Sequence, residues 1–168
     1  KEAGLSSVDV NLSVSDGAFA GAVDAGQLYQ NSGAAAGVNI NIVQEPADGY
    51  WSNVWLKKPW CACYWSGRAT EDWMFSTAYE SGVPWNDTGW ENERFQSLLM
   101  QGRAELDTGL RGEIYREMQA ICRDEGGTVV PMYQNYVDAK SNRVEHSGQT
   151  GNLWMLDNLR SCKRWWSA

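Results

Sequence analysis

The sequence lacks an excess of positive charge. Its 14 lysines and arginines are outnumbered by 21 aspartates and glutamates, which gives a formal net charge of −7. Nucleic acids and anionic membranes repel such a chain unless it carries a segregated basic patch. The pairs Lys57-Lys58 and Lys163-Arg164 are too short to form one. We therefore expect neither a nucleic acid nor an anionic membrane as the main partner.

Long apolar runs are also missing. No stretch approaches the roughly 20 consecutive apolar residues of a membrane-spanning helix, and the N-terminal residues Lys1–Leu5 lack the apolar core of a signal peptide. We expect the chain either to stay where it is made or to begin after a segment that has been removed. Its 168 residues, 43% of them hydrophobic, suffice for one globular domain with a docking tail.

Sequence signals of the common enzyme classes are absent as well. The chain has one histidine, His146, no Gly-x-Ser-x-Gly elbow and no phosphate-binding glycine loop after a predicted strand. We expect no metal and no cofactor. Two alternatives to a binding role stay open. One is a small hydrolase of the glycoside hydrolase kind, which would use a carboxylate pair beside tryptophans, and the other is a structural or interaction domain.

The four cysteines allow three full pairings, and the sequence does not choose among them. Cys61 and Cys63 are two positions apart on a predicted strand, so they point to opposite faces and should not pair with each other. As a pair without a second ligand cluster they are a weak zinc signal, and we expect buried structural cysteines. A bond between Cys122 and Cys162 stays open.

Apolar periodicity predicts an α/β fold in the first part of the chain. Apolar and polar residues alternate over Val8–Val14 and again from Val38 to a stop at Glu45, and an Ala-rich helix is predicted over Phe19–Ala36 between them. Strand, helix and strand with short connections form a βαβ unit with parallel strands. A short helix over Tyr50–Leu56 and a buried strand over Cys61–Trp65 would repeat the unit. We therefore expect a mostly parallel sheet of repeated βαβ units flanked by helices.

The second part is mainly helical by the same reasoning. Helices are predicted over Glu71–Glu80, Asn92–Leu106 and Leu110–Glu125, followed by a short strand over Val129–Tyr133. The pair Trp165-Trp166 near the end is too aromatic to leave in water, which predicts docking onto another surface.

Candidate binding residues follow from this layout, because open α/β sheets bind ligands beyond the carboxyl ends of their strands. Arginine suits a carboxylate, aspartate or glutamate an ammonium, and tryptophan a stacked group. The alternative is that Trp73 and Phe75 are core residues and that Arg68 pairs with Glu71 or Asp72 on the surface. The candidate ligand-binding residues are Trp65, Arg68, Glu71, Asp72, Trp73, Tyr133 and Asn135.

An ordered set of short segments carries a resemblance to a known family. The segments are Ala35-Ala36-Gly37-Val38-Asn39-Ile40, Tyr64-Trp65-Ser66-Gly67, Phe95-Gln96-Ser97-Leu98-Leu99, Arg111-Gly112-Glu113-Ile114-Tyr115 with Met118-Gln119, and Val129-Val130-Pro131-Met132-Tyr133. Their order resembles the C-terminal lobe of bacterial extracytoplasmic solute-binding proteins of the peptide/nickel (dipeptide/oligopeptide-binding) class of ABC importers. The resemblance is clear from Lys1 to Val137.

The resemblance implies a periplasmic-binding-protein-like lobe over residues 1–140 and a C-terminal tail over 141–168 that packs on a first lobe. It implies a periplasmic protein, not an enzyme, whose partners are a small-molecule or peptide solute, the first lobe of the same protein and an ABC permease. Dipeptide-binding members carry an aspartate shortly after the Trp-x-Gly turn, which holds a peptide's amino terminus. Glu71 stands nearest that position here and Arg68 adds a cation. Without the first lobe, the exposed Trp165-Trp166 pair predicts self-association.

Overall fold

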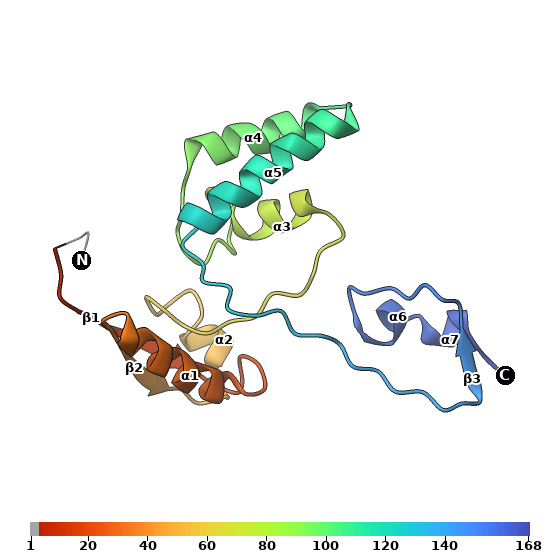
Figure 1. Cartoon of the computed structure of the whole chain (residues 1–168), viewed down its shortest axis with the longest axis horizontal. Helices are drawn as coiled ribbons and strands as arrows, with labels where there is room; N and C mark the ends of the chain where they lie inside the picture. The colour runs from red at the N-terminus through yellow and green to blue at the C-terminus, as the bar shows by residue number, and fades with distance from the viewer. Residues whose placement is uncertain (1–3) are drawn as a thin grey trace. The chain divides into compact units, whose positions relative to one another are not determined.

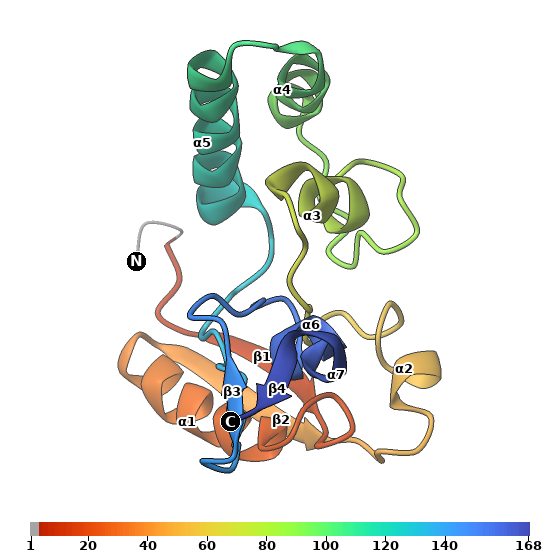
Figure 2. The same cartoon turned by 90° about the vertical axis from the view of Figure 1, so that its right-hand side faces the viewer.

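The computed structural model describes residues 4–168, and Lys1–Ala3 lie outside the described residues. The chain divides into two units, Lys1–Trp65 and Ser66–Ala168 (Figures 1 and 2), here called unit 1 and unit 2. Each unit has hydrophobic clusters of its own. Among the described residues, no helix combines the length and the apolarity that crossing a membrane requires.

Unit 1 contains the predicted βαβ unit. Strand β1 (Val8–Val14) and strand β2 (Val38–Gln44) pair in parallel over their full lengths, and helix α1 (Ala22–Ala35) connects them. The alternating sequence explains the pairing. Leu12 and Ile40 are buried on the face that α1 covers, while the neighbouring asparagines, Asn11, Asn39 and Asn41, lie at the surface. The prediction of one parallel βαβ unit is confirmed.

Helix α1 is shorter than predicted and uses its glycines for packing. It begins at Ala22 rather than at Phe19. A side-chain carbon placed on Gly26 would lie 3.0 Å from Cγ1 of Val14, so this glycine lets the helix approach β1 closely. Gly37, with a φ of +79°, ends the helical segment in the left-handed region, as predicted for a helix stop.

The predicted strand over Cys61–Trp65 forms only a single parallel bridge, between Ser13 and Cys61. The Ser13 amide donates to the Trp60 carbonyl oxygen at 3.1 Å, and the Ala62 amide donates to the Ser13 carbonyl oxygen at 2.9 Å. Beyond Ala62 the segment leaves β1. Within the described residues the parallel sheet therefore has two strands, and the predicted repetition of the βαβ unit is not confirmed.

Helix α2 (Tyr50–Asn53) covers only the first turn of the predicted helix Tyr50–Leu56. Leu56 has a φ of +60°, which no right-handed helix accommodates, and Pro59 follows shortly afterwards. The residues after α2 therefore form turns.

Unit 2 contains three longer helices whose ends differ from the predicted ones by two residues or fewer: α3 (Glu71–Ala78), α4 (Glu93–Ala104) and α5 (Thr108–Glu125). Each begins after a side chain that accepts backbone N–H groups of the first turn. The caps are Thr70, which accepts from the Trp73 amide at 3.2 Å, Asn92, which accepts from the Phe95 amide at 2.9 Å, and Asp107, which accepts from the Gly109 amide at 2.8 Å.

The helical core of unit 2 is built from the predicted apolar stripes. Its buried residues are Phe75, Phe95, Leu98, Leu99 and Met118. Leu106, the last residue of the predicted helix Asn92–Leu106 and by its spacing part of the apolar stripe with Phe95, Leu98 and Leu99, is instead 88% exposed. Because α4 ends at Ala104 and the next residue is extended, Leu106 no longer lies on the helix face to which its spacing would assign it.

The residues after α5 form no strand at Val129–Tyr133, so that prediction is wrong. Residues 129–143 are exposed throughout. The remaining elements are strand β3 (Val144–His146), a left-handed turn labelled α6 (Met155–Leu159), helix α7 (Ser161–Arg164) and strand β4 (Trp165–Ser167). Strands β3 and β4 pair antiparallel, which places the imidazole of His146 5.3 Å from the Trp165 ring.

Candidate functional site

The seven sequence-predicted site residues are distributed over both units. Trp65 is the last residue of unit 1, and the other six belong to unit 2. Each unit contains one cluster of side chains that is relevant to binding.

Unit 1 carries a chain of aromatic rings around Trp51. The Trp51 ring lies edge to face with Tyr50 at 5.7 Å, with Trp55 at 5.8 Å and with Tyr64 at 5.5 Å between ring centres. Trp55 continues the chain to Trp65 at 6.3 Å. Perpendicular ring contacts of this kind are favourable because the positive ring edge meets the negative ring face. Trp65, the candidate predicted from sequence, is thus one end of an aromatic surface, here called the aromatic platform: Trp51, Trp55, Tyr64 and Trp65.

Tyr50 fixes this platform to the end of the sheet. Its side chain is 1% exposed, and its hydroxyl lies 2.6 Å from the Ala62 carbonyl oxygen and 3.3 Å from the Ser13 carbonyl oxygen. Burial, with a smaller contribution from the nearby cysteines, raises the pKa of this hydroxyl, so it stays a hydrogen-bond donor. Ser13 is the penultimate residue of β1, which places the platform at the carboxyl end of that strand.

Arg68 in unit 2 folds back on the loop that carries it. Its Nη1 donates to the Ser66 carbonyl oxygen at 2.9 Å and to the Ser66 hydroxyl at 3.0 Å. Its guanidinium carbon lies 5.5 Å from the centre of the Trp73 ring, a cation–π distance. Trp73 is 54% exposed, so the alternative in which it belongs to the core is wrong, whereas Phe75 is indeed a core residue.

Glu71 and Asp72 line a groove of about 820 Å³. The first turn of α3 forms one side of this groove, and the end of α4 and the outer face of α5 form the rest. The polar lining residues from α4 and α5 include Arg103, Arg111, Tyr115, Arg116 and Gln119. Carboxylates on one side and guanidinium groups on the other are suited to a polar or zwitterionic solute.

Asp72 is already engaged within this groove. The Nε atom of Arg103 lies 2.8 Å from Oδ1 of Asp72. Its Nη2 atom donates to the Ser76 hydroxyl at 2.5 Å and lies 3.5 Å from a carboxylate oxygen of Glu80. Burial, followed by the negative charge of Asp72, raises the pKa of the Tyr115 hydroxyl. The ion pair that Asp72 makes in this groove is with Arg103, and the alternative in which Arg68 pairs with Glu71 or Asp72 stays a prediction.

Tyr133 and Asn135 lie in the exposed segment after α5, and Tyr133 is 92% exposed. Neither residue is among those that line the groove formed by α3, α4 and α5. Their assignment to a binding site stays a prediction.

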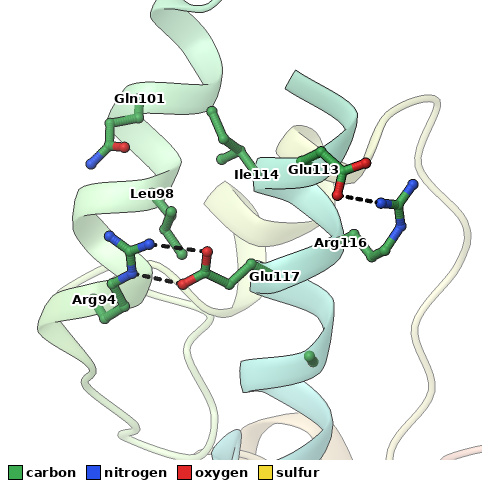
Figure 3. A pocket seen from close by; sticks show the side chains of 8 residues that line it. Arg94, Leu98, Gln101, Glu113, Ile114, Arg116 and Glu117 are labelled. Carbon is green, nitrogen blue, oxygen red and sulfur yellow. Dashed lines mark hydrogen bonds and ion pairs between the residues drawn. The ribbon is translucent and has the colours of Figure 1, made fainter. Parts of the chain in front are cut away.

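A second, smaller groove of about 430 Å³ runs between α4 and α5 (Figure 3). Arg94 and Glu117 close it with a two-pronged ion pair, Nε to Oε1 at 2.7 Å and Nη2 to Oε2 at 3.0 Å, and Arg116 pairs with Glu113. The hydrogen bond and charge of Arg94 lower the pKa of Glu117. Because the Arg94–Glu117 pair joins α4 to α5 and the Arg116–Glu113 pair lies within α5, the charges of this groove are paired with one another, and we interpret the groove as a helix contact at the surface.

No group of three or more His, Cys, Asp and Glu side chains in residues 4–168 is placed to hold a metal ion. The four cysteines all lie in that range and form no disulfide there. Burial raises the pKa of Cys122 to about 12, whereas Cys162 is exposed.

Sequence reasoning missed the polar face of α5 and the platform residues before Trp65. Arg111, Tyr115 and Gln119 recur every four residues, which is the spacing of one helix face and could have marked the groove. Trp51 and Trp55 are also four residues apart, but it is the turns after α2 that bring them into contact with the rings of Tyr64 and Trp65.

Comparisons with known proteins place these features in a wider setting. No family model matches the chain. Over 48 residues the chain is 44% identical to the oligopeptide-binding protein OppA of Bacillus subtilis (strain 168), a match that covers 29% of this chain and 9% of OppA.

Two solved structures are similar to the chain. The structure of HbpA2 from Haemophilus parasuis has a TM-score of 0.62 at 18% identity and matches 75% of this chain. The ABC transporter substrate-binding protein CtaP from Listeria monocytogenes has a TM-score of 0.54 at 20% identity and matches 73% of this chain. In each case the matched part is 26% of the other protein, so the chain spans about a quarter of these structures.

The resemblance predicted from the sequence is confirmed, because the similar proteins include an oligopeptide-binding protein and an ABC transporter substrate-binding protein. At these identities the structural likeness shows the fold alone, which corresponds to part of the periplasmic binding protein fold.

Proposed function

We propose that this chain is a ligand-binding lobe of an extracytoplasmic solute-binding protein, and that it helps to deliver a small polar, peptide-like solute to an ABC importer. The observation that carries the proposal is the likeness of about three quarters of the chain to a solved ABC transporter substrate-binding protein. The sequence match to an oligopeptide-binding protein supports the choice of a peptide-like solute.

The described side chains favour binding over catalysis. Asp72 lies in an ion pair with Arg103 at 2.8 Å, so its carboxylate is already engaged by a neighbouring helix. Aromatic rings and paired charges instead offer surfaces for stacking and for hydrogen bonding. The protein would act by closure of two lobes around the solute, without bond chemistry.

The partners in this proposal are the solute, a first lobe of the same protein and an ABC permease, and the location is periplasmic or, more generally, extracytoplasmic. Residues 141–168 would pack on the first lobe. The exposed rings of Trp154 and Trp166 in that segment support such a contact.

A titration followed by tryptophan fluorescence tests the proposal. The chain is titrated with dipeptides and tripeptides, with amino-acid derivatives and with oligosaccharides, and saturable binding of a peptide-like solute is expected. A variant with Trp65→Ala and Arg68→Ala should lose most of this binding, while the control Trp85→Ala, another exposed tryptophan, should keep it.

Full binding by the double variant would show that these two residues are not the site. If no solute binds, and the chain instead hydrolyses a glycoside with an activity that Glu71→Gln abolishes, the enzyme alternative replaces the proposal. A ligand that copurifies with the protein, identified by mass spectrometry, would name the solute directly.

A further inference from the structure

The aromatic platform presents ring surface to solvent at its centre. Trp51 is 40% exposed and Tyr64 is 59% exposed, and their rings meet at 5.5 Å with an interplanar angle of 81°. Two perpendicular rings with open surface form a corner that a third ring can enter and contact on two sides. Trp51 belongs to α2, and Tyr64 belongs to the segment that follows the bridge between Ser13 and Cys61.

The platform is held in place before any ligand arrives. The buried Tyr50 ties α2 to the carbonyl oxygens of Ser13 and Ala62, and Trp55 lies between Trp51 and Trp65. A preorganised surface loses little conformational freedom on binding, so ring contacts there contribute to affinity.

Positive charge in residues 4–65 is concentrated in the turn that follows α2. In residues 4–65 the cationic side chains are Lys57 and Lys58, whereas five aspartates and glutamates are spread over the rest of that range. Both lysines are exposed, and their amides donate to the Val54 carbonyl oxygen in the turn that directly follows α2. Each ammonium group is carried on a flexible four-carbon stem, and both lysines lie between Trp51 and Tyr64 in the sequence.

We propose that the platform binds the carboxyl-terminal residue of a peptide-like solute when that residue is aromatic, with the ring in the corner of Trp51 and Tyr64 and the terminal carboxylate facing Lys57 and Lys58. A carboxyl-terminal aromatic residue joins one ring to one negative charge, which is the combination that the platform and its lysines complement. This inference rests on the proposed function and specifies the solute class.

Three tripeptides separate the ring from the charge: Ala-Ala-Phe, its carboxyl-terminal amide, and Ala-Ala-Ala. Their binding to the 168-residue chain is measured by isothermal calorimetry at low salt. Ala-Ala-Phe should bind roughly tenfold more tightly than Ala-Ala-Ala, because an aromatic contact on one ring face is worth about that factor. It should also bind more tightly than the amide, and added salt should reduce that second difference.

Substitutions test whether the platform causes the preference for phenylalanine and whether its neighbouring lysines cause the preference for the free carboxylate. Trp51→Ala and Tyr64→Ala should each remove the preference for phenylalanine, and Lys57→Gln with Lys58→Gln should remove the preference for the free carboxylate. Trp85→Ala and Lys163→Gln, which change a tryptophan and a lysine in unit 2, are the matched controls and should change neither preference. Circular dichroism of each variant verifies folding, and the lysine variants, which alter only exposed side chains, test the inference independently of packing.

Equal affinity for the three tripeptides would overturn this inference and leave the proposed function standing, since solute binding itself would have been measured. A preference for an oligosaccharide over all three would overturn it in favour of a sugar on the same rings. If no peptide or other solute binds, the proposed function fails and the inference fails with it.

Discussion

Replacement of Tyr50 by phenylalanine should weaken unit 1 by a measurable amount. The substitution keeps the buried ring and deletes one hydroxyl, which lies 2.6 Å from the Ala62 carbonyl oxygen. Loss of a buried hydrogen bond that leaves its acceptor unpaired costs about 1 to 2 kcal/mol. With a urea slope of about 2 kcal/mol per molar, the unfolding midpoint should fall by about 0.5 to 1 M. Near-ultraviolet circular dichroism follows this unfolding, because the Tyr50 ring contacts Trp51 and Trp51 contacts Trp55. The signal of these tryptophans depends on their packing and is lost when unit 1 unfolds.

The matched control is Tyr64→Phe, since Tyr64 is 59% exposed and water can replace any partner of its hydroxyl. A loss as large in the control as in Tyr50→Phe, or no loss in Tyr50→Phe, would refute the reasoning.

The same variant should change the alkaline stability of the protein. Burial raises the pKa of Tyr50 in the folded state above its value in the unfolded state. As the pH rises past about 10, the unfolded chain releases this proton first, so the contribution of Tyr50 is complete below that pH and is lost above it. Tyr50→Phe should therefore show a smaller decrease in stability between pH 9 and pH 11 than the unmodified chain, as measured by urea unfolding at each pH.

Two further predictions concern unit 2. Phe95→Ala should destabilise the helices by about 3 to 5 kcal/mol, because the Phe95 ring is fully buried and its centre lies 5.2 Å from that of Phe75 and 5.1 Å from that of Trp90. An unfolding midpoint equal to that of the unmodified chain would contradict this prediction. At pH 8 a thiol reagent such as dithionitrobenzoate should label the exposed Cys162 well before Cys122, because burial raises the pKa of the Cys122 thiol to about 12. Mass spectrometry measures the two labelling rates, and equal rates would show that Cys122 is accessible.

The helices of unit 2 could be predicted from sequence because their signals are local. A capping side chain stands immediately before each helix, as with Asn92 and Asp107, and the apolar spacing sets the buried face. The first βαβ unit was predictable for a similar reason, since the alternation in β1 and β2 depends on each strand alone.

The binding surfaces were only partly predictable because they depend on contacts between distant segments. The sequence places Trp65 and Arg68 at a strand end and the loop after it, and Asp72 in the first turn of the next helix. The structure gives Trp65 a ring contact, Arg68 a cation–π contact and Asp72 an ion pair, while their assignment to a binding site stays a prediction. Arg103, which holds Asp72, comes from a different helix and has no spacing signal that links the two. The role of Trp51 likewise depends on the turns that follow α2.

The segments that failed as strands share a physical cause. Val129–Tyr133 is rich in β-branched and aromatic residues, and Cys61–Trp65 reads as a buried strand, but such a preference reports how well side chains fit a pleated, half-buried surface. A strand also needs a neighbour for its backbone N–H and C=O groups. Ser13 supplies one at Cys61, and the pairing ends there, while Val129 and Tyr133 lie in an exposed stretch. The same requirement explains the antiparallel strand pair that was not predicted. Strands β3 and β4 have three residues each, too few for a recognisable alternation, and each provides the neighbour that the other needs.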